Sequence, residues 1–275
     1  MSLFRPCAVC GAPLRLLKPW LARCDACGFL ASNLEPGPGT GLEGLEDLRR
    51  ANIAATLDRL ARSAPLAGVT LLDVGCAKGW FLSAARERGA QVHGIEPQEV
   101  HVRDGRAAGL SIDLGFFPAD LSRPGPYGII AFNDVFEHLP APEQAIRDVE
   151  RLLKPGGIAV INLPSSAGAL YRIATVLDRL GMSGSFERMW QKGLPSPHMS
   201  YVSPDNLRML VERHTALRQI DSFALPSFRR ARLWQRIEVT HRGPAALAMF
   251  VGLWGLSFVL PLLPPDIHVG VFQKP

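Results

Sequence analysis

Four of the five cysteines lie within the first 27 residues, in two pairs of equal spacing. Each pair encloses two residues and is followed by a glycine, and thirteen residues separate the pairs. Two such turns bring four thiolates to one ion, which is the closed tetrahedral arrangement of structural zinc. The first ten residues lack the apolar run of a secretory signal, which predicts a cytoplasmic protein, and a reducing cytosol disfavours the alternatives of two disulfides or a redox pair. We predict a structural Zn²⁺ site made by Cys7, Cys10, Cys24 and Cys27.

A glycine-rich bend follows an apolar run in the stretch LLDVGCAKGWFL. Asp73 precedes the bend, and Gly75 and Gly79 lie within it. Glycines at these points let the backbone approach a ligand, and the N-terminus of the helix after the bend offers unpaired N–H groups to a carboxylate or phosphate. Cys76 lies inside the bend, where a small apolar filler is a better interpretation than a reactive thiol.

Further polar residues come at the ends of later apolar runs. Glu96 ends the run QVHGIE, about 20 residues after the bend, where an acid accepts hydrogen bonds from a ribose diol. Asn133 and Asp134 end the run GIIAFN, and Glu137 and His138 follow. The carboxyl ends of parallel strands meet at one edge of a sheet, so we expect these groups to converge there.

The elements that must position these residues alternate along the chain. An amphipathic helix is predicted over residues 45–63, and a later helix is expected to stop at Pro155-Gly156-Gly157. We predict strands over residues 69–74, 91–96, 111–115, 128–133, 158–164, 217–226 and 267–274, with helices after the first, second and fourth of them. This alternation predicts an α/β fold with a Rossmann-like, doubly wound sheet that has helices on both faces.

In these motifs the chain resembles the class I S-adenosylmethionine-dependent methyltransferases over about residues 45–225. The resemblance implies seven strands with the seventh antiparallel, and S-adenosyl-L-methionine as cofactor. Ala77 stands where the family pattern has a middle glycine, and Phe116 stands where relatives often carry an acid for adenine, so backbone contacts or Asp120 are the alternatives there. The cofactor residues implied are Asp73, Gly75, Cys76, Ala77, Gly79, Glu96, Pro97, Phe116, Asn133 and Asp134.

Methyl transfer to a hydroxyl or amine benefits from a base that takes the acceptor's proton. The spacing Asp134-x-x-Glu137-His138 resembles the acid-x-x-Glu-His cluster that binds a divalent ion in ubiquinone-type O-methyltransferases. The alternative is that Glu137 and His138 orient the next helix while Asp134 lines the cofactor pocket. A second histidine, His198, precedes a helix that begins at Ser203-Pro204. It follows residues 165–197, which we expect to form a lid segment over the substrate. The candidate catalytic residues are His138, Asp134 and His198.

An insertion of unusual composition, residues 227–265, separates the last two predicted strands. Five arginines precede an uncharged stretch from Gly243 to Pro265. Prolines limit its helix to about 17 residues, near the minimum for a span, and a span would carry the last strand away from its sheet, so we reject one. A helix that docks residues 229–264 on an anionic membrane and a buried helix or dimer interface remain as alternatives, and we favour the first.

These patterns divide the chain into a zinc ribbon over residues 1–34, a linker over residues 35–44 and a methyltransferase domain over residues 45–275. The predicted function is methylation of a small-molecule, lipid-linked or sugar acceptor. We expect the methylated atom to be oxygen, because oxygen is the most common acceptor atom on base rate. An RNA methyltransferase is the runner-up. The modest charge of the ribbon and the absence of a basic and aromatic stripe argue against nucleic acid. A non-catalytic module that kept the cofactor fold is the third hypothesis.

Overall fold

The computed structural model describes residues 4–36, 46–62, 65–228, 234, 243–259 and 262–275. Its larger sheet has seven strands in the order β10-β11-β8-β7-β4-β5-β6. Strands β8, β7, β4, β5 and β6 are parallel, while β11 runs antiparallel to both β8 and β10. The strands are β4 (Thr70–Val74), β5 (Gln91–Glu96), β6 (Ile112–Leu114), β7 (Tyr127–Asn133), β8 (Leu153–Pro164), β10 (Arg218–Leu225) and β11 (Ile267–Gln273). The predicted Rossmann-like sheet with an antiparallel seventh strand is confirmed.

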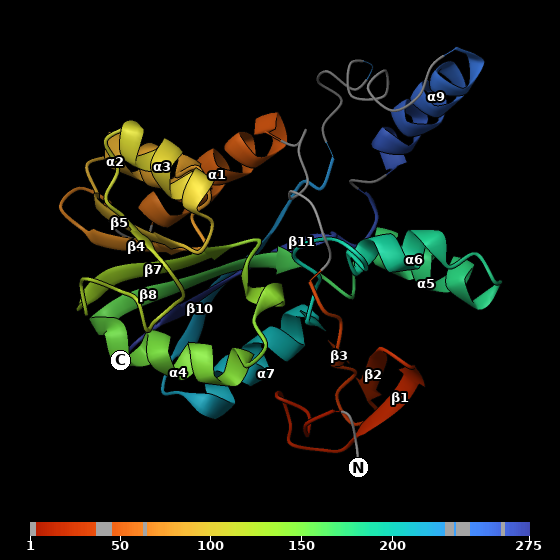
Figure 1. Ribbon diagram of the computed structural model, residues 1–275, viewed down its shortest axis with the longest axis horizontal. Helices are drawn as coiled ribbons and strands as arrows, with labels where there is room; N and C mark the ends of the chain where they lie inside the picture. The colour runs from red at the N-terminus through yellow and green to blue at the C-terminus, as the bar shows by residue number, and fades with distance from the viewer. Residues whose placement is uncertain (1–3, 37–45, 63–64, 229–233, 235–242, 260–261) are drawn as a thin grey trace.

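Helices cover both faces of this sheet (Figure 1). One face carries α1 (Glu46–Ala61), α2 (Trp80–Glu87) and α3 (Glu99–Ala107), and the other carries α4 (Pro142–Leu152) and α7 (Pro204–His214). The central strand β7 is apolar because both of its faces are buried. Its alternate residues divide between the two layers: Ile130 and Phe132 belong to one core cluster, and Ile129 and Ala131 to the other.

One predicted boundary is wrong. Helix α4 ends at Leu152 and β8 begins at Leu153, five residues before the strand predicted to start at Ile158. The backbone of Gly156 and Gly157 exchanges hydrogen bonds with Lys274, at 3.0 and 2.9 Å. This pairing with the chain after β11 holds the Pro-Gly-Gly segment extended, so it forms the beginning of the strand instead of a loop.

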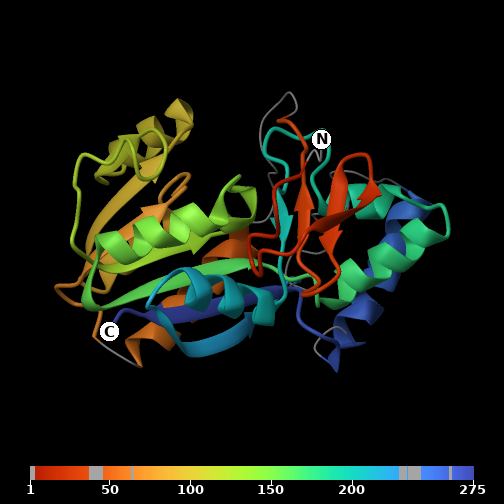
Figure 2. The ribbon, with the colours of Figure 1, turned by 90° about the horizontal axis from the view of Figure 1, so that it is seen from below.

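The N-terminal region forms a second sheet with a strand from far along the chain. The strands β1 (Leu14–Lys18), β2 (Leu21–Cys24), β3 (Leu30–Ser32) and β9 (Ser200–Tyr201) lie in the order β1-β2-β3-β9. Figure 2 shows the ribbon strands beside the lid helices α5 (Ala169–Arg179) and α6 (Gly184–Met189). The ribbon therefore completes its sheet with a strand that follows the lid segment.

Helix α9 (Pro244–Val259) lies at the same end of the molecule as α5 in both ribbon views (Figures 1 and 2). In the part of the chain that the structure describes, no helix is long and apolar enough to cross a bilayer. The arginines of the predicted insertion and most of the predicted linker, residues 37–44, lie outside the described residues.

Candidate functional site

The loop between β4 and α2 has a backbone that requires small residues. Gly75, Ala77 and Gly79 have φ angles of 66°, 45° and 76°, all in the left-handed region. A Cβ at Gly75 would lie 2.6 Å from a methyl group of Val135, and one at Gly79 would overlap Leu110. Ala77 is thus an L-residue in a conformation that favours glycine. The loop presents its backbone at the carboxyl end of β4, as the sequence predicted.

Two N–H groups of this loop are tied to the neighbouring strand. Gly75 and Cys76 donate to the carbonyl oxygen of Ile95, at 2.8 and 3.2 Å. The Cys76 side chain is buried and packs against Gly94, where an added Cβ would lie 2.6 Å from its sulfur. Burial raises the pKa of the Cys76 thiol, and the charges of Asp73 and Glu96 act in the same direction. These contacts agree with a filling role for Cys76.

Two buried acids stand at the carboxyl ends of β4 and β5. Asp73 accepts a hydrogen bond from the Asn133 amide at 2.9 Å, which links β4 to β7. Burial raises the pKa of Asp73 to about 7, and the charge of Glu96 adds to the effect. Glu96 accepts from the N–H groups of Ala77 and Gln98, each at 3.0 Å. Residues from three strands therefore converge on one edge of the sheet.

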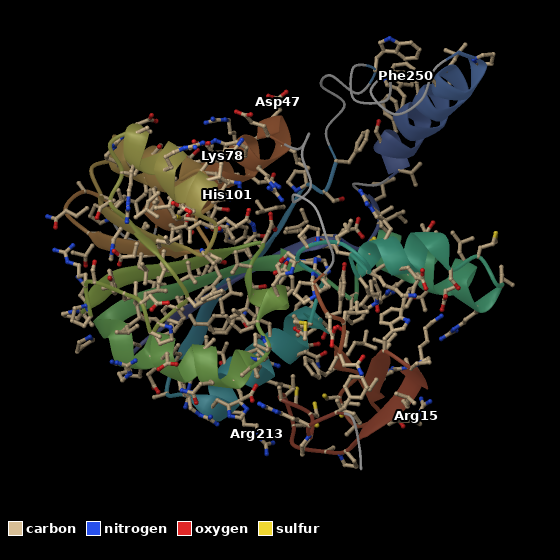
Figure 3. The ribbon with its side chains drawn as sticks, viewed as in Figure 1. Arg15, Asp47, Lys78, His101, Arg213 and Phe250 are labelled. Atoms are coloured by element: carbon tan, nitrogen blue, oxygen red, sulfur yellow. The ribbon has the colours of Figure 1, made fainter. Side chains whose placement is uncertain are left out.

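His101, which the sequence reasoning missed, adjoins this group. Its Nδ1 lies 3.7 Å from a Glu96 oxygen and has no hydrogen-bond partner among the described residues. Helix α3 also packs against the loop, since a Cβ at Gly105 would lie 3.9 Å from the Lys78 carbonyl; Figure 3 labels Lys78 and His101 in this region. The sequence feature that could have identified His101 is its position near the start of the helix that follows Glu96.

Two predicted cofactor residues lie at the surface. Pro97 is exposed directly after Glu96. Phe116 is 70% exposed, and its N–H donates to the Asp120 carboxylate at 2.8 Å. Asp120 therefore holds the loop after β6 in place. The preceding residue, Gly115, donates its N–H to the Glu96 carbonyl at 3.1 Å, so the loop that carries Phe116 begins beside the end of β5.

A second polar cluster joins residues that are 60 positions apart. Glu137 and His138 lie on the short 3-10 helix η1 (Phe136–His138) after β7, and His198 lies just before β9. Both imidazole Nε2 atoms approach the same Glu137 oxygen, at 4.0 Å for His138 and 3.9 Å for His198. The two rings meet edge to face, with centroids 4.8 Å apart.

Burial governs the charges of this cluster. It raises the pKa of Glu137 well above its usual range, with a further contribution from the Asp134 charge. It lowers the pKa of His138, although a bond to the Pro197 carbonyl at 2.9 Å opposes the shift. It lowers the pKa of His198 to about 3, and the neighbouring His138 acts in the same direction. Both imidazoles are therefore neutral at pH 7.

Two buried atoms of the cluster lack hydrogen-bond partners in the described structure, Glu137 Oε2 and His198 Nδ1. The Nδ1 bond of His138 to the Pro197 carbonyl assigns the proton to Nδ1 and leaves the Nε2 lone pair free. The donor atoms of the three residues lie within 4.8 Å of one another. The cluster can accept a hydroxyl proton or provide one carboxylate and two imidazole ligands to a cation.

Asp134 is directed elsewhere. It has a φ angle of 56°, and its carboxylate lies 3.8 Å from the Arg49 guanidinium of α1. Burial raises the pKa of Asp134, and Arg49 opposes that shift. The group that the structure gathers around Glu137 and His138 thus contains His198 in place of Asp134.

The four N-terminal cysteines form one compact group. Their sulfur atoms lie within 4.8 Å of one another, with 3.5 Å between Cys7 and Cys27 and 3.3 Å between Cys10 and Cys24. Both separations exceed the roughly 2.05 Å of a disulfide bond, so these are thiols. Gly11 and Gly28 close the two turns, each with a φ angle of 79°. Four sulfurs at this spacing fit a tetrahedral zinc site.

The lid helices use their aromatic side chains for packing. Phe186 and Trp190 are buried in one cluster with Trp20 of the ribbon and Tyr201 of β9. Met182 is 53% exposed. Phe186 and Trp190 therefore pack this segment against the ribbon and β9.

Comparison with known proteins places this fold in a family. The family model described as "Methyltransferase domain" matches residues 45–214, more than half of the chain. A ubiquinone biosynthesis O-methyltransferase of Xylella fastidiosa strain 9a5c is 27% identical over 215 residues, which cover 74% of this chain and 82% of that protein. The enzyme of the same name from Caulobacter vibrioides is 33% identical over 123 residues, which cover 41% of this chain and about half of that relative's length, 49%.

The solved structures show the same architecture. A SAM-dependent methyltransferase from Archaeoglobus fulgidus superimposes with a TM-score of 0.52 at 16% identity, over 84% of this chain and 97% of that one. This likeness concerns the fold alone. Together with the matched family model and the loop and acids at the ends of β4 and β5, it establishes that the chain belongs to the methyltransferase-domain family and has the fold of the S-adenosylmethionine-dependent methyltransferases.

Proposed function

We propose that this protein transfers the methyl group of S-adenosyl-L-methionine to an oxygen atom of a small-molecule, lipid-linked or sugar acceptor. The observation that carries the proposal is the convergence of Asp73, Ala77, Glu96 and Asn133 where β4, β5 and β7 end. The names of the Xylella and Caulobacter relatives favour oxygen as the methylated atom and favour a small-molecule or lipid-linked acceptor over RNA.

We assign the cofactor contacts to the loop after β4 and to the polar residues at the ends of β4, β5 and β7. The Glu96 carboxylate would accept hydrogen bonds from the ribose hydroxyls, and the loop from Gly75 to Gly79 would approach the methionine end of the cofactor. His101 beside Glu96 offers a further polar contact. The bound cofactor supplies an electrophilic sulfonium methyl, so the protein's task is to hold it in line with the acceptor and exclude water.

We assign the acceptor side to Glu137, His138 and His198. His138 Nε2 is the stronger candidate for the base, because its lone pair is free and its Nδ1 is fixed by Pro197. His198 has a pKa of about 3, so it remains neutral and serves better as a hydrogen-bonding group. The same three side chains also fit a divalent cation, which would lower the pKa of an acceptor hydroxyl.

The cation alternative predicts binding of Mn²⁺ to the purified protein. Paramagnetic resonance of added Mn²⁺ should then show a bound ion that is lost in Glu137→Gln and retained in Glu150→Gln, which changes a carboxylate away from the cluster. If the intact protein binds no Mn²⁺, and activity is equal with chelator and with metal, the base assignment stands alone.

The first test of the function is cofactor binding by titration calorimetry with S-adenosylhomocysteine. We expect binding in the micromolar range and a loss of about 10-fold to 100-fold in Glu96→Ala, the cost of one or two hydrogen bonds to a charged group. Glu99→Ala, an exposed acid in the first turn of α3, is the matched control and should bind normally. If the folded protein does not bind, the non-catalytic module takes over as the better hypothesis.

We also propose that the enzyme contacts an anionic phospholipid bilayer through residues 229–264. Helix α9 exposes Leu247, Val251, Trp254 and Phe258, which follow one another at helical spacing along one stripe. Helix α5 and the residue that follows it expose a second stripe at the same end of the molecule, made by Ile173, Val176 and Leu180. The sequence just before α9 carries five arginines and one acid, which complements anionic head groups.

Vesicle sedimentation tests this contact. Wild type should sediment with phosphatidylglycerol vesicles and much less with phosphatidylcholine vesicles, and Val251→Glu with Trp254→Glu should abolish sedimentation. Val100→Glu places a carboxylate on an exposed apolar site of α3 and should have no effect. If the double variant instead converts a dimer to a monomer, while vesicle binding of the wild type is absent, the stripe is a dimer interface.

A further inference from the structure

The segment His198–Met199 is bound on both sides by distant parts of the chain. The Ser32 hydroxyl donates to the His198 carbonyl at 2.6 Å, and the Ser32 N–H donates to the Met199 carbonyl at 2.9 Å. On the opposite side, the Met199 N–H donates to the Glu137 carbonyl at 2.8 Å. Ser32 and His198 are buried, with exposed fractions of 7% and 5%. One ribbon residue thus holds the backbone that carries His198.

Pairing between β3 and β9 extends this contact. Leu30 pairs with Tyr201 and Ala31 pairs with Ser200, in antiparallel register. Strand β9 has two residues and, among the described strands, pairs with no other than β3. A slip of one residue would exchange the faces of β9 and remove Tyr201 from its core. The ribbon therefore determines the register of the segment that begins at His198.

The two cysteine turns are anchored to opposite ends of α7. Asn206, in its first turn, donates from its amide to the Cys27 carbonyl at 2.8 Å. His214, its last residue, donates from Nε2 to the Ala8 carbonyl at 2.7 Å. These two contacts fix the orientation of the ribbon on the methyltransferase body, so Ser32 has a defined place against His198.

The ribbon and the lid also share one hydrophobic core. Leu21 and Leu30 of the ribbon pack in a single cluster with Tyr171, Trp190 and Tyr201. An ion pair of 2.7 Å between Lys18 of β1 and Asp178 of α5 lies at its edge. In contrast, the hydrogen bonds described above for Asp73 and Glu96 are made by residues between positions 73 and 133. The ribbon thus contacts the acceptor side and leaves the cofactor side to other elements.

We propose that Ser32 is a positioning residue of the acceptor site, through which the N-terminal ribbon places His198 beside Glu137 and His138. This inference rests on the proposed methyl transfer for its consequence in catalysis. Ser32 touches neither acceptor nor cofactor; it acts through the backbone of His198 and Met199. Loss of its hydroxyl should therefore move His198 and slow methyl transfer while cofactor affinity stays the same.

Histidine resonances of protein labelled with ¹³C at Cε1 give a readout that does not depend on activity. In Ser32→Ala we expect the signals of His138 and His198 to shift, and the signal of His93 to stay. His93 is the internal control, because its two ring nitrogens contact Asp113 and Tyr127 and it is not a member of the Glu137 cluster. His138→Gln and His198→Gln assign the two signals.

Matched variants separate positioning from general damage. Ser32→Thr keeps the hydroxyl and should restore the wild-type signals, whereas Thr56→Val removes a buried hydroxyl from α1 and should leave them unchanged. If Ser32→Ala does not fold, Ser32→Cys keeps the volume with a weaker donor and should show a smaller shift of the same signals. Unchanged His138 and His198 signals, or an equal change at His93, would overturn the proposal.

The kinetic arm uses whichever acceptor the enzyme methylates. We expect kcat of Ser32→Ala to fall about 10-fold to 100-fold, the scale of a small misplacement, with the S-adenosylhomocysteine dissociation constant within twofold of wild type. Equal loss of cofactor affinity would contradict a role confined to the acceptor side. If wild type neither binds cofactor nor methylates any acceptor, the proposed function fails, and the histidine signals still decide whether Ser32 positions His198.

Discussion

Ala77 is the residue at which the loop proposed to bind the cofactor departs from the family's glycine pattern, and the structure shows the consequence. Its φ angle of 45° lies in the left-handed region, where an L-residue with a Cβ costs roughly 1 kcal/mol or more. The backbone N–H of Ala77 nevertheless reaches Glu96 at 3.0 Å. The position therefore stores strain in the segment assigned to the cofactor.

We predict that Ala77→Gly raises the free energy of unfolding by up to about 1 kcal/mol, because glycine adopts this conformation without a Cβ clash. Urea unfolding measures the change. Ala84→Gly in α2 is the control and should destabilise by about 1 kcal/mol, because a helix interior penalises glycine. Equal destabilisation by both variants would contradict strain at Ala77.

Asp73 makes stability depend on pH. Its pKa is about 7 in the folded protein and near 3.8 when the chain is unfolded, since burial and Glu96 disfavour its charge. Between these values the folded state binds more protons than the unfolded state, so this residue's contribution to stability is present at pH 4 and is lost as the pH rises to 7. The full difference corresponds to a loss on the order of 4 kcal/mol.

Asp73→Asn should remove that contribution. Denaturant unfolding of the cofactor-free protein at several pH values should show wild type losing stability relative to the variant between pH 4 and pH 7. The comparison with the variant is necessary because His138 and His198, whose pKa values are lowered, change stability in the opposite direction. Parallel pH profiles would show that Asp73 ionises at its ordinary pKa.

At the scale of elements, α7 begins with a complete capping box. The Ser203 hydroxyl accepts from the Asn206 N–H at 3.1 Å, and the Asn206 side chain accepts from the Ser203 N–H at 3.4 Å. The Asn206 amide also reaches the Cys27 carbonyl. Asn206 therefore takes part both in capping α7 and in holding the ribbon against it.

Ser203→Ala should lower the free energy of unfolding by about 1 kcal/mol, because the Asn206 N–H loses its side-chain acceptor at the helix start. Ser203→Asp retains an acceptor at this position and should recover most of the loss. Thermal unfolding followed by circular dichroism measures both. An unfolding temperature of Ser203→Ala equal to that of wild type would contradict a stabilising role for this cap.

The sequence predicted elements well where the pattern is local. The strand at Gln91–Glu96 has the predicted bounds, because an apolar run is followed by an acid and a helix start. The sequence did not predict the start of β8. Gly156 and Gly157 pair with Lys274, more than 100 residues away, and this pairing keeps the Pro-Gly-Gly segment extended. No local pattern encodes such a partner.

At the scale of the whole molecule, the cysteine ribbon carries core residues for the methyltransferase body as well as for itself. Cys7, Val9, Cys24 and Phe29 belong to the same core cluster as residues of α4 and α7, such as Ile146 and Leu207. Metal bound by the cysteines would therefore stabilise more than the ribbon, since the ribbon covers part of the larger core.

We predict one zinc ion per chain by elemental analysis of the purified protein, and none in Cys10→Ser with Cys27→Ser. Loss of about 3 kcal/mol on metal removal corresponds to a fall of roughly 5 °C in melting temperature for a chain of this size. Cys76→Ser, which changes the cysteine outside the ribbon, should keep the zinc. Stoichiometric zinc in the double variant would refute the four-cysteine site.

The sequence by itself determined the alternation of strands and helices, the acids at strand ends and the paired cysteines. These features depend on periodicity and short spacing, which a single segment expresses without its neighbours. For the same reason, the positions of Asp73 and Glu96 at the ends of two successive strands were sufficient to assign both acids to one edge of the sheet.

Only the tertiary structure decided which side chains meet across long separations. It placed His198 beside Glu137, paired Asp134 with Arg49, and turned Phe116 toward solvent. It also joined Ser32 to His198 across 166 residues. Such contacts follow from how sheets, helices and the ribbon pack together, and packing is a property of the whole chain that no local spacing contains.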